Sequence, residues 1–314
     1  MANEVKCRHC GNGWNSQECK CVAHQECGGK GCDGCELVDD KPHHSPTSLE
    51  LLFKCGEAYR RRYVEGERIP PGVAMLRGGG VHRGVEANFS QKVESFRDLP
   101  TAEVVEISVE SFNAKWEREG VELTAEEKSV GVAKTKNATT RVVKSLSELF
   151  HEKAAPRYQP TRVEEGFRLV LPGSHDLVGF LDVIAHDRHD PDEVKRVVDV
   201  KTAAKKKSLA DVDGSLQLTA YAAGACVLED EVEIDVRLEV AVATKTPKIQ
   251  SVQSHRDYVD FKALENRIEV ATSIIGHGDF QPAAIGAWWC SPKWCGYWST
   301  CPYVNADRKG ACEI

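Results

Sequence analysis

The 314-residue sequence has no uninterrupted apolar run of about 18 residues, which argues against a membrane-spanning helix. Its first ten residues, MANEVKCRHC, lack an apolar signal core, so we expect a cytoplasmic protein. There is no excess of positive charge either: the net charge of −7 excludes a globally basic nucleic-acid coat, although a local basic groove stays open. The 41% hydrophobic and 28% charged residues instead indicate a folded globular chain of one or two domains.

Cysteine, in contrast, is abundant. The chain has 13 cysteines, an odd number, and a reducing cytosol disfavours disulfides, so metal binding is the better interpretation. Two groups stand out. Seven cysteines lie within the first 35 residues and four within the last 25, whereas Cys55 and Cys226 stand apart.

Residues 1–40 contain little apolar material, so they need a metal to fold. Two C-x-x-C pairs have zinc-ribbon spacing and predict one zinc ion bound by Cys7, Cys10, Cys32 and Cys35. A second zinc ion would use Cys19, Cys21, His24 and Cys27. We therefore expect a small zinc module at 1–40, followed by a linker over 39–48.

The remainder alternates between helical and extended patterns. We predict helices over about 48–63, from 81 into the 90s, through much of 101–155, and over 214–228 and 258–277. Strands are predicted over 164–171, 177–186, 194–202, 232–244 and 248–254, with the second and third forming a hairpin. This order predicts an α/β fold, a mixed central sheet with helices on both sides.

The predicted hairpin carries a charged cluster on apolar strands. Asp199 and Lys201 are two residues apart and point to one face, and Asp182 of the first strand can face Asp199. Two carboxylates beside an ammonium suit divalent-metal hydrolysis. The alternative is a surface salt bridge, but the valines around Asp199 indicate a partly buried setting, where charges need a reason.

Four segments occur in a recognisable order: GGGVHRGVE, GFLDVI, VVDVKT and QLTAY. Over residues 47–305 this order resembles the RecB-like branch of the PD-(D/E)XK nucleases. The resemblance implies a restriction-endonuclease-like core that binds Mg²⁺ or Mn²⁺ through His82, Asp182, Asp199 and the Val200 carbonyl. It further implies that Lys201 is the catalytic lysine and that Gln217 and Tyr221 position the site. Glu86, one helical turn after His82, is a weaker candidate.

The same resemblance implies a function. We expect two-metal phosphodiester hydrolysis by a single-strand DNA exonuclease of resection, recombination or repair. The alternatives are an inert protein that binds DNA ends or partners, and a structure-selective endonuclease. The sequence has no G-x-x-x-x-G-K-[ST] motif, so unwinding would need a helicase partner; a recombinase is another expected partner. The layout suits a phage or mobile-element gene.

The C-terminal segment WWCSPKWCGYWSTCPY predicts a second metal centre. Cys290, Cys295 and Cys301 need a fourth ligand, either the nearby Cys312 or the distant Cys55. One cysteine before the core and three after it resembles family members with a 4Fe-4S cluster, which would use Cys55. Zinc and reduced structural thiols are the alternatives, and residues 306–314 would form a tail.

Overall fold

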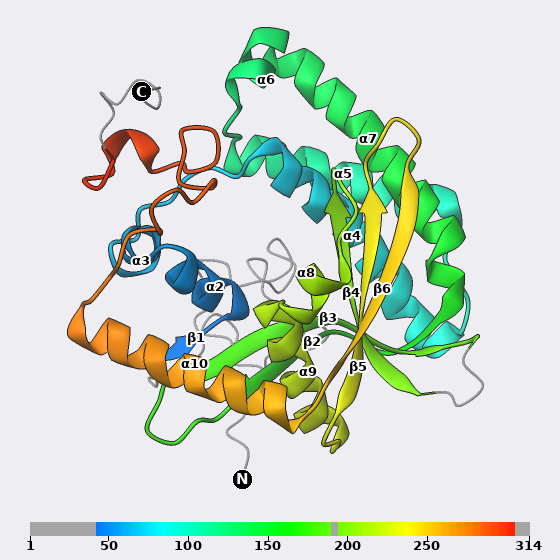
Figure 1. The fold of residues 1–314 in the computed structure, drawn as a ribbon. Coiled ribbons are helices and arrows are strands. Elements are labelled where there is room, and N and C mark those ends of the chain that lie inside the picture. Colours follow the sequence, from blue (N-terminus) through cyan, green and yellow to red (C-terminus); the bar gives the residue numbers. More distant parts are fainter. Residues whose placement is uncertain (1–41, 190–193, 305–314) are drawn as a thin grey trace, which may run out of the picture.

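The computed structural model describes residues 42–189 and 194–304, which form a six-stranded mixed sheet flanked by helices (Figure 1). Strand β3 (Asp176–Asp187) pairs antiparallel with β2 (Tyr158–Leu169) along one edge. On its other edge it pairs with β1 (His43–His44) near its start and β4 (Lys195–Ala203) near its end. The predicted hairpin and mixed sheet are thus confirmed, while the expected linker over 39–48 contributes β1 to the sheet.

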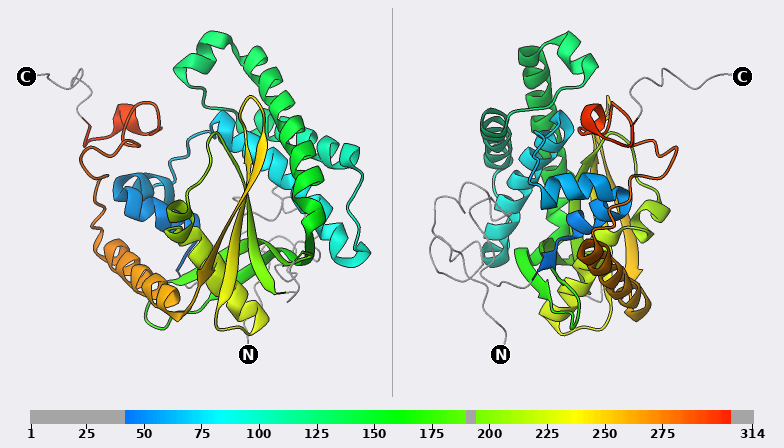
Figure 2. Two further views of the ribbon diagram at one scale, coloured as in Figure 1. Left: turned by 45° about the vertical axis from the view of Figure 1, so that its right-hand side comes forward. Right: turned by 90° about the vertical axis from the view of Figure 1, so that its left-hand side faces the viewer.

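The other half of the sheet continues from β4. This strand pairs in parallel with β5 (Ile234–Val242), which pairs antiparallel with β6 (Lys248–Arg256). Helices cover both faces (Figure 2). One layer contains α4 (Val73–Ser95), α5 (Thr101–Glu119), α6 (Ala125–Val130) and α7 (Val132–Lys153). The other contains α2 (Pro46–Lys54), α9 (Leu216–Glu229) and α10 (Tyr258–His277). Short pieces complete the path: α3 (Gly56–Tyr59), a π-helical turn η1 (Arg60–Val64), η2 (Ala155–Arg157), α8 (Leu209–Asp213) and η3 (Trp298–Thr300).

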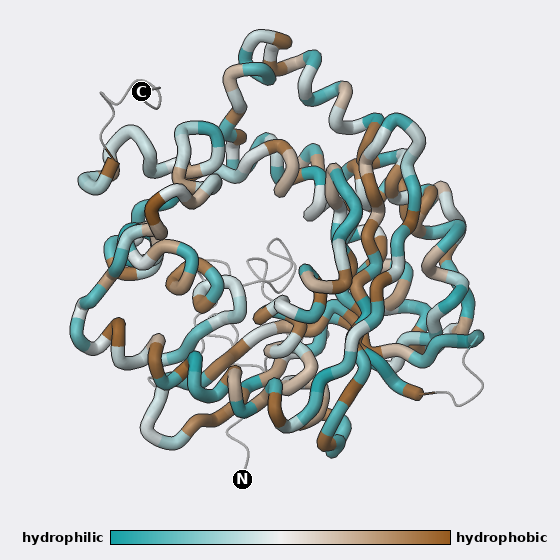
Figure 3. The backbone as a smooth tube through the Cα atoms, in the orientation of Figure 1, coloured by the Kyte–Doolittle hydropathy of each residue, from teal (hydrophilic) through white to brown (hydrophobic). Residues whose placement is uncertain are grey.

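Two hydrophobic cores lie on opposite faces of the sheet. Because side chains alternate along a strand, Val197 packs into the core beside α9, whereas Val198 and Val200 pack into the core beside α4. Apolar positions consequently recur along the strands in Figure 3. Asp199 shares the face of Val197, so a carboxylate is buried on the α9 side of β4.

Helix α4 begins at Val73, eight residues before the predicted start at Val81, so the glycines near His82 lie inside the helix. They permit close packing against α5. A Cβ at Gly80 would lie 2.8 Å from the Cβ of Phe112, and one at Gly84 would lie 2.0 Å from Ser108 Oγ. The glycines therefore fix how near α4 can lie to α5, and with it the place of His82.

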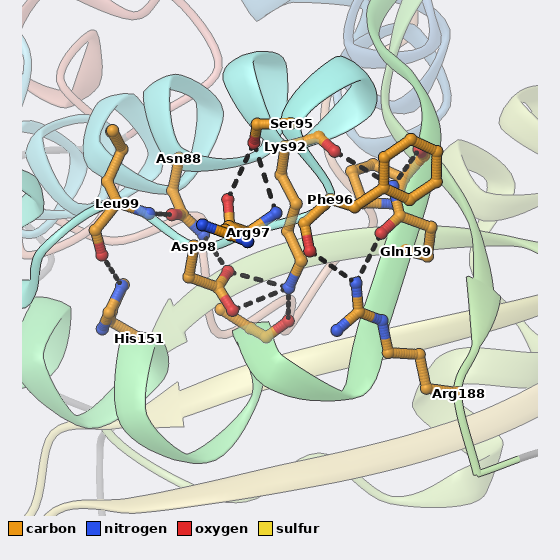
Figure 4. A network of polar contacts seen from close by, with 12 residues as sticks. Asn88, Lys92, Ser95, Phe96, Arg97, Asp98, Leu99, His151, Gln159 and Arg188 are labelled. Carbon is orange, nitrogen blue, oxygen red and sulfur yellow. Dashed lines mark hydrogen bonds and ion pairs between the residues drawn. The ribbon is translucent and has the colours of Figure 1, made fainter.

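A buried polar network holds the C-terminal end of α4 (Figure 4). The fully buried Lys92 ammonium lies 2.8 Å from both carboxylate oxygens of Asp98 and donates to the Ala155 carbonyl, also at 2.8 Å. Asn88 donates to the same carboxylate and accepts from the Leu99 amide. The buried charge is therefore paired and hydrogen-bonded, and the network joins the C-terminal end of α4 to the following loop and to η2.

The predicted helix over 48–63 is broken. It starts with Ser45 as N-cap and Pro46 in the first turn, and ends at Cys55, whose φ of −165° and ψ of 101° are extended. A new helix, α3, starts at Gly56. A Cβ there would lie 2.7 Å from the Gln281 nitrogen, so glycine permits the C-terminal segment to pass directly over this break.

Candidate active site

Strands β3 and β4 diverge at the predicted carboxylates. Their last backbone pair is Val183 with Val198, and beyond it the Val200 amide donates to Asp182 Oδ2 at 3.0 Å. Within the described residues, no strand pairs with this edge of β3 between Leu177 and Val183. The fork leaves Asp182 and Asp199 side by side, 5% and 1% exposed.

Asp199 and Lys201 face the same side of β4, as predicted. The Lys201 ammonium lies 2.9 Å from Asp199 Oδ1, and among the residues that the structure describes no other group donates a hydrogen bond to either Asp199 oxygen. Burial raises the pKa of Asp199 above its usual range, Lys201 opposes this, and the Asp182 carboxylate adds to it. A buried carboxylate whose oxygens are not fully engaged in hydrogen bonds can serve as a ligand of a divalent cation.

His82, which lies in α4, contacts Asp182. Its Nε2 lies 2.9 Å from Asp182 Oδ2 and 3.4 Å from Glu164 Oε1. Glu164 lies in β2 and is 6% exposed. Its φ of 49° is left-handed, a conformation that costs energy for a residue with a side chain. This distortion interrupts the β2–β3 pairing opposite Asp182, at the site itself.

His82 and Glu164 belong to a group of three residues that could bind a metal ion. One ligand atom each from His82, Glu86 and Glu164 lies within 4.8 Å of the others. His82 and Glu86 are one turn apart on α4 and so share a face. The carboxylate oxygens suit Mg²⁺ or Mn²⁺, and the imidazole nitrogen is better suited to a transition metal such as Mn²⁺ than to Mg²⁺. The residues present therefore fit a divalent metal, and they add Glu164, which the sequence analysis did not single out, to the predicted ligands.

Helix α9 contributes the last predicted pair. Gln217 Nε2 donates to the Tyr221 hydroxyl at 2.8 Å, which leaves the tyrosine proton able to be donated onwards. Burial raises the pKa of Tyr221 well above its usual value, and the Asp182 and Asp199 carboxylates reinforce this. The backbone N–H of Gln217 donates a hydrogen bond to Glu50 Oε1 of α2 at 3.2 Å, so α2 also borders the site.

The thiols of Cys55, Cys290, Cys295 and Cys301 are near enough to interact electrostatically. Burial raises the pKa of Cys290, and the other three thiols add to the effect. Burial also raises the pKa of Cys295, with contributions from Cys55 and Cys301. All four are free thiols, and Cys55 occupies the extended break between α2 and α3. Four neighbouring thiols match in number the ligands of a zinc ion or an iron–sulfur cluster.

Contacts around these cysteines join distant parts of the chain. The Arg61 guanidinium donates to the Thr300 hydroxyl at 2.8 Å and to its carbonyl at 3.0 Å. The Tyr297 hydroxyl donates to the Glu67 carbonyl at 2.8 Å. The remaining predicted ligands lie outside the described residues: Cys7, Cys10, Cys19, Cys21, His24, Cys27, Cys32, Cys35 and Cys312.

The sequence profile of the PD-(D/E)XK nuclease superfamily matches residues 43–302. Among solved structures, a candidate exonuclease from Eubacterium rectale is 13% identical, with a TM-score of 0.48 over 85% of this chain and 90% of that chain. The protein SSO0001 is 12% identical, with a TM-score of 0.30 over 79% and 94%. No curated protein matches the sequence.

Because the profile covers most of the sequence, the chain belongs to the PD-(D/E)XK nuclease superfamily. It is a metal-dependent nuclease, a phosphodiester hydrolase that uses divalent ions such as Mg²⁺ or Mn²⁺. In the described part of the chain, no helix combines the length and apolar character needed to cross a membrane.

Proposed function

We propose that the chain is a single-strand DNA exonuclease of end resection, recombination or repair, of the RecB-like type. One observation carries the catalytic part of this proposal: His82, Asp182, Asp199 and Lys201 come from three separate elements and meet at the fork between β3 and β4. The choice of single-stranded ends is supported by the order of the four motifs and is tested below.

We propose that His82, Asp182, Asp199 and the Val200 carbonyl hold Mg²⁺ or Mn²⁺, in a two-metal arrangement with Glu164 and Glu86 as further ligands. When bound, such ions polarise the phosphate and activate water. The Lys201 ammonium balances charge that develops on the phosphoryl oxygens. The Tyr221 hydroxyl donates to a substrate oxygen while Gln217 holds it in place. Water adds to phosphorus and gives up one proton, the P–O bond to the leaving nucleotide breaks, and the leaving oxygen takes up a proton in exchange.

We further propose that Cys55, Cys290, Cys295 and Cys301 hold a 4Fe-4S cluster. The electrostatic interaction among the four thiols and the extended break between α2 and α3 at Cys55 support this assignment. Such a cluster would join the start and end of the nuclease core and would not touch the phosphate. Zinc in the segment over 1–40, through Cys7, Cys10, Cys32 and Cys35, remains part of the proposal.

The decisive experiment compares linear and circular substrates. End-labelled single strands, the matching duplex and covalently closed single-stranded circles are incubated with Mg²⁺ or Mn²⁺. We expect degradation of linear single strands, intact circles, and loss of activity in Asp199→Asn. Cleaved circles would instead identify an endonuclease, and binding without hydrolysis by the wild type would identify an inert end-binding protein.

A further inference from the structure

A group of exposed tryptophans lies beside the cysteine cluster and has no role in the nuclease core. Trp288 and Trp294 are 65% and 61% exposed. The Trp288 ring makes edge contacts with Trp289 at 5.7 Å and with Trp294 at 5.5 Å between ring centroids. These contacts hold the indoles in a fixed arrangement although much of their surface stays open. We call Trp288, Trp289, Trp294, Lys54 and Lys293 the tryptophan surface.

Two lysines give this surface its charge. The Lys54 ammonium lies 5.8 Å from the Trp288 ring centroid and 5.3 Å from that of Trp289. The Lys293 ammonium lies 5.6 Å from the Trp294 ring centroid and 3.8 Å from Glu126 Oε1, and the side chains of both Lys293 and Glu126 are exposed. Exposed rings with adjoining cations are what single-stranded nucleic acids bind, because every base offers a face for stacking and every nucleotide a phosphate. An apolar protein partner would not call for the two cations.

The tryptophan surface lies near the active site along α2. Glu50 of this helix accepts the hydrogen bond from Gln217 and interacts electrostatically with Lys201. Lys54 is four residues further on, about one turn or roughly 6 Å along the axis. In Figure 1 the segment that carries the tryptophans runs beside α2 and α3. A strand leading from the surface to Lys201 would therefore follow α2.

We propose that bases of the incoming strand stack on Trp288 and Trp294 while Lys54 and Lys293 contact its phosphates. This inference rests on the proposed single-strand substrate and assigns its binding surface. Stacking is insensitive to base identity, so the surface would hold a strand of any sequence as it is shortened from its end.

The test measures binding by the full chain in an Asp199→Asn background with Ca²⁺, so that no substrate is cut. Fluorescence anisotropy follows a labelled thymidine oligonucleotide and an abasic oligonucleotide of equal length and charge. We expect Trp288→Ala with Trp294→Ala to weaken thymidine binding by about tenfold or more and leave abasic binding nearly unchanged. The phenylalanine variants should retain much of the thymidine affinity. Tyr258→Ala, which removes another ring that is 72% exposed, should change neither.

Equal losses on both oligonucleotides, or no loss on either, would overturn the inference. Unchanged visible absorption and thermal unfolding of the variants separate a binding defect from misfolding. Loss of thymidine binding in a protein whose wild type cuts no DNA would retain the tryptophan surface and reject the proposed nuclease function, so the two failures are distinguishable. The inference would also be contradicted if another protein bound at Trp288 while the alanine variants retained their affinity for the thymidine oligonucleotide.

Discussion

The Lys201 ammonium lies 2.9 Å from Asp199 Oδ1, two positions earlier on the same strand. Burial alone would lower the pKa of Lys201, but the Asp199 and Asp182 carboxylates outweigh it, so the pKa lies above its ordinary value. The two carboxylates therefore favour the charged form of Lys201. As an ammonium, Lys201 can stabilise negative charge and orient water.

Replacing Lys201 with methionine should reduce hydrolysis by at least about two orders of magnitude, because a charge stabiliser acts chiefly on the transition state. DNA binding should change far less. Lys205→Met is the matched control, since Lys205 is an exposed lysine of the adjoining loop. Single-turnover cleavage and anisotropy measure the two effects, and undiminished cleavage by Lys201→Met would reject its catalytic role.

Glu164→Gln should weaken the divalent metal without unfolding the protein. Glutamine keeps the shape but loses the charge that holds the cation. We expect the Mn²⁺ concentration for half-maximal activity to rise by roughly tenfold or more, and calorimetric Mn²⁺ affinity to fall alongside. The neighbouring Glu165→Gln, whose side chain is 35% exposed, should behave as wild type. Equal metal affinity in both variants would remove Glu164 from the ligand set.

Cys55→Ser should remove the visible absorption of anaerobically purified protein, because a 4Fe-4S cluster needs four thiolates. It should also lower the unfolding temperature, since the cluster would close a very long loop of chain. Cys312→Ser and Cys226→Ser should leave the colour intact; Cys226 is buried elsewhere, among the core residues of α9. If Cys312→Ser loses the visible absorption and Cys55→Ser keeps it, the ligand set that includes Cys55 is wrong.

Acid should destabilise the protein partly through His44. This side chain is fully buried beside His175, and burial, with His175 and His43, lowers its pKa to about 4. An unfolded histidine titrates near 6.5, so between about pH 6.5 and 4 only the unfolded state gains the proton. Stability is unaffected above this window and falls as the pH drops through it, by up to about 3 kcal/mol.

Chemical denaturation of wild type and His44→Leu across pH 7.5–4.5 isolates that contribution. As the pH falls, the free energy of unfolding of wild type should decrease more than that of His44→Leu. His255→Leu provides the opposite sign, because the hydrogen bond to Asp235 raises the pKa of His255 and its benefit is lost as the pH rises. A pH-independent difference for His44 would contradict the prediction.

Much of the site could be predicted from local patterns. Asp199 and Lys201 share a face because residues two apart on any strand do, and the apolar neighbours of Asp199 require a buried strand. Asp182 follows from the hairpin. Gln217 and Tyr221 follow from helical spacing, and their hydrogen bond confirms that they face each other. These inferences need only the period of the element.

Glu164 could not be found in this way. Its role depends on a left-handed residue inside β2 and on the register of that strand against β3, neither of which has a local sequence signal. The helix break at Cys55 was also missed, because the apolar pattern continues across it and tertiary contacts with Gln281 decide the conformation. The early start of α4 was missed because three consecutive glycines, Gly78–Gly80, disfavour a helix by local propensity, whereas Gly80 lies inside α4 where it packs closely against Phe112 of α5.

The contacts between Arg61 and Thr300 join positions 239 residues apart, and this separation has a consequence for protein synthesis. At about 5–20 residues per second, a ribosome needs roughly ten to fifty seconds to pass from one to the other. During that time the nascent chain contains α2 and α3 but lacks Thr300, which later contacts Arg61. Asp182, Asp199 and Lys201 all emerge within the same interval. The contacts of Thr300 with Arg61 would therefore form only after Asp182, Asp199 and Lys201 have been synthesised, because all three precede Thr300 in the chain.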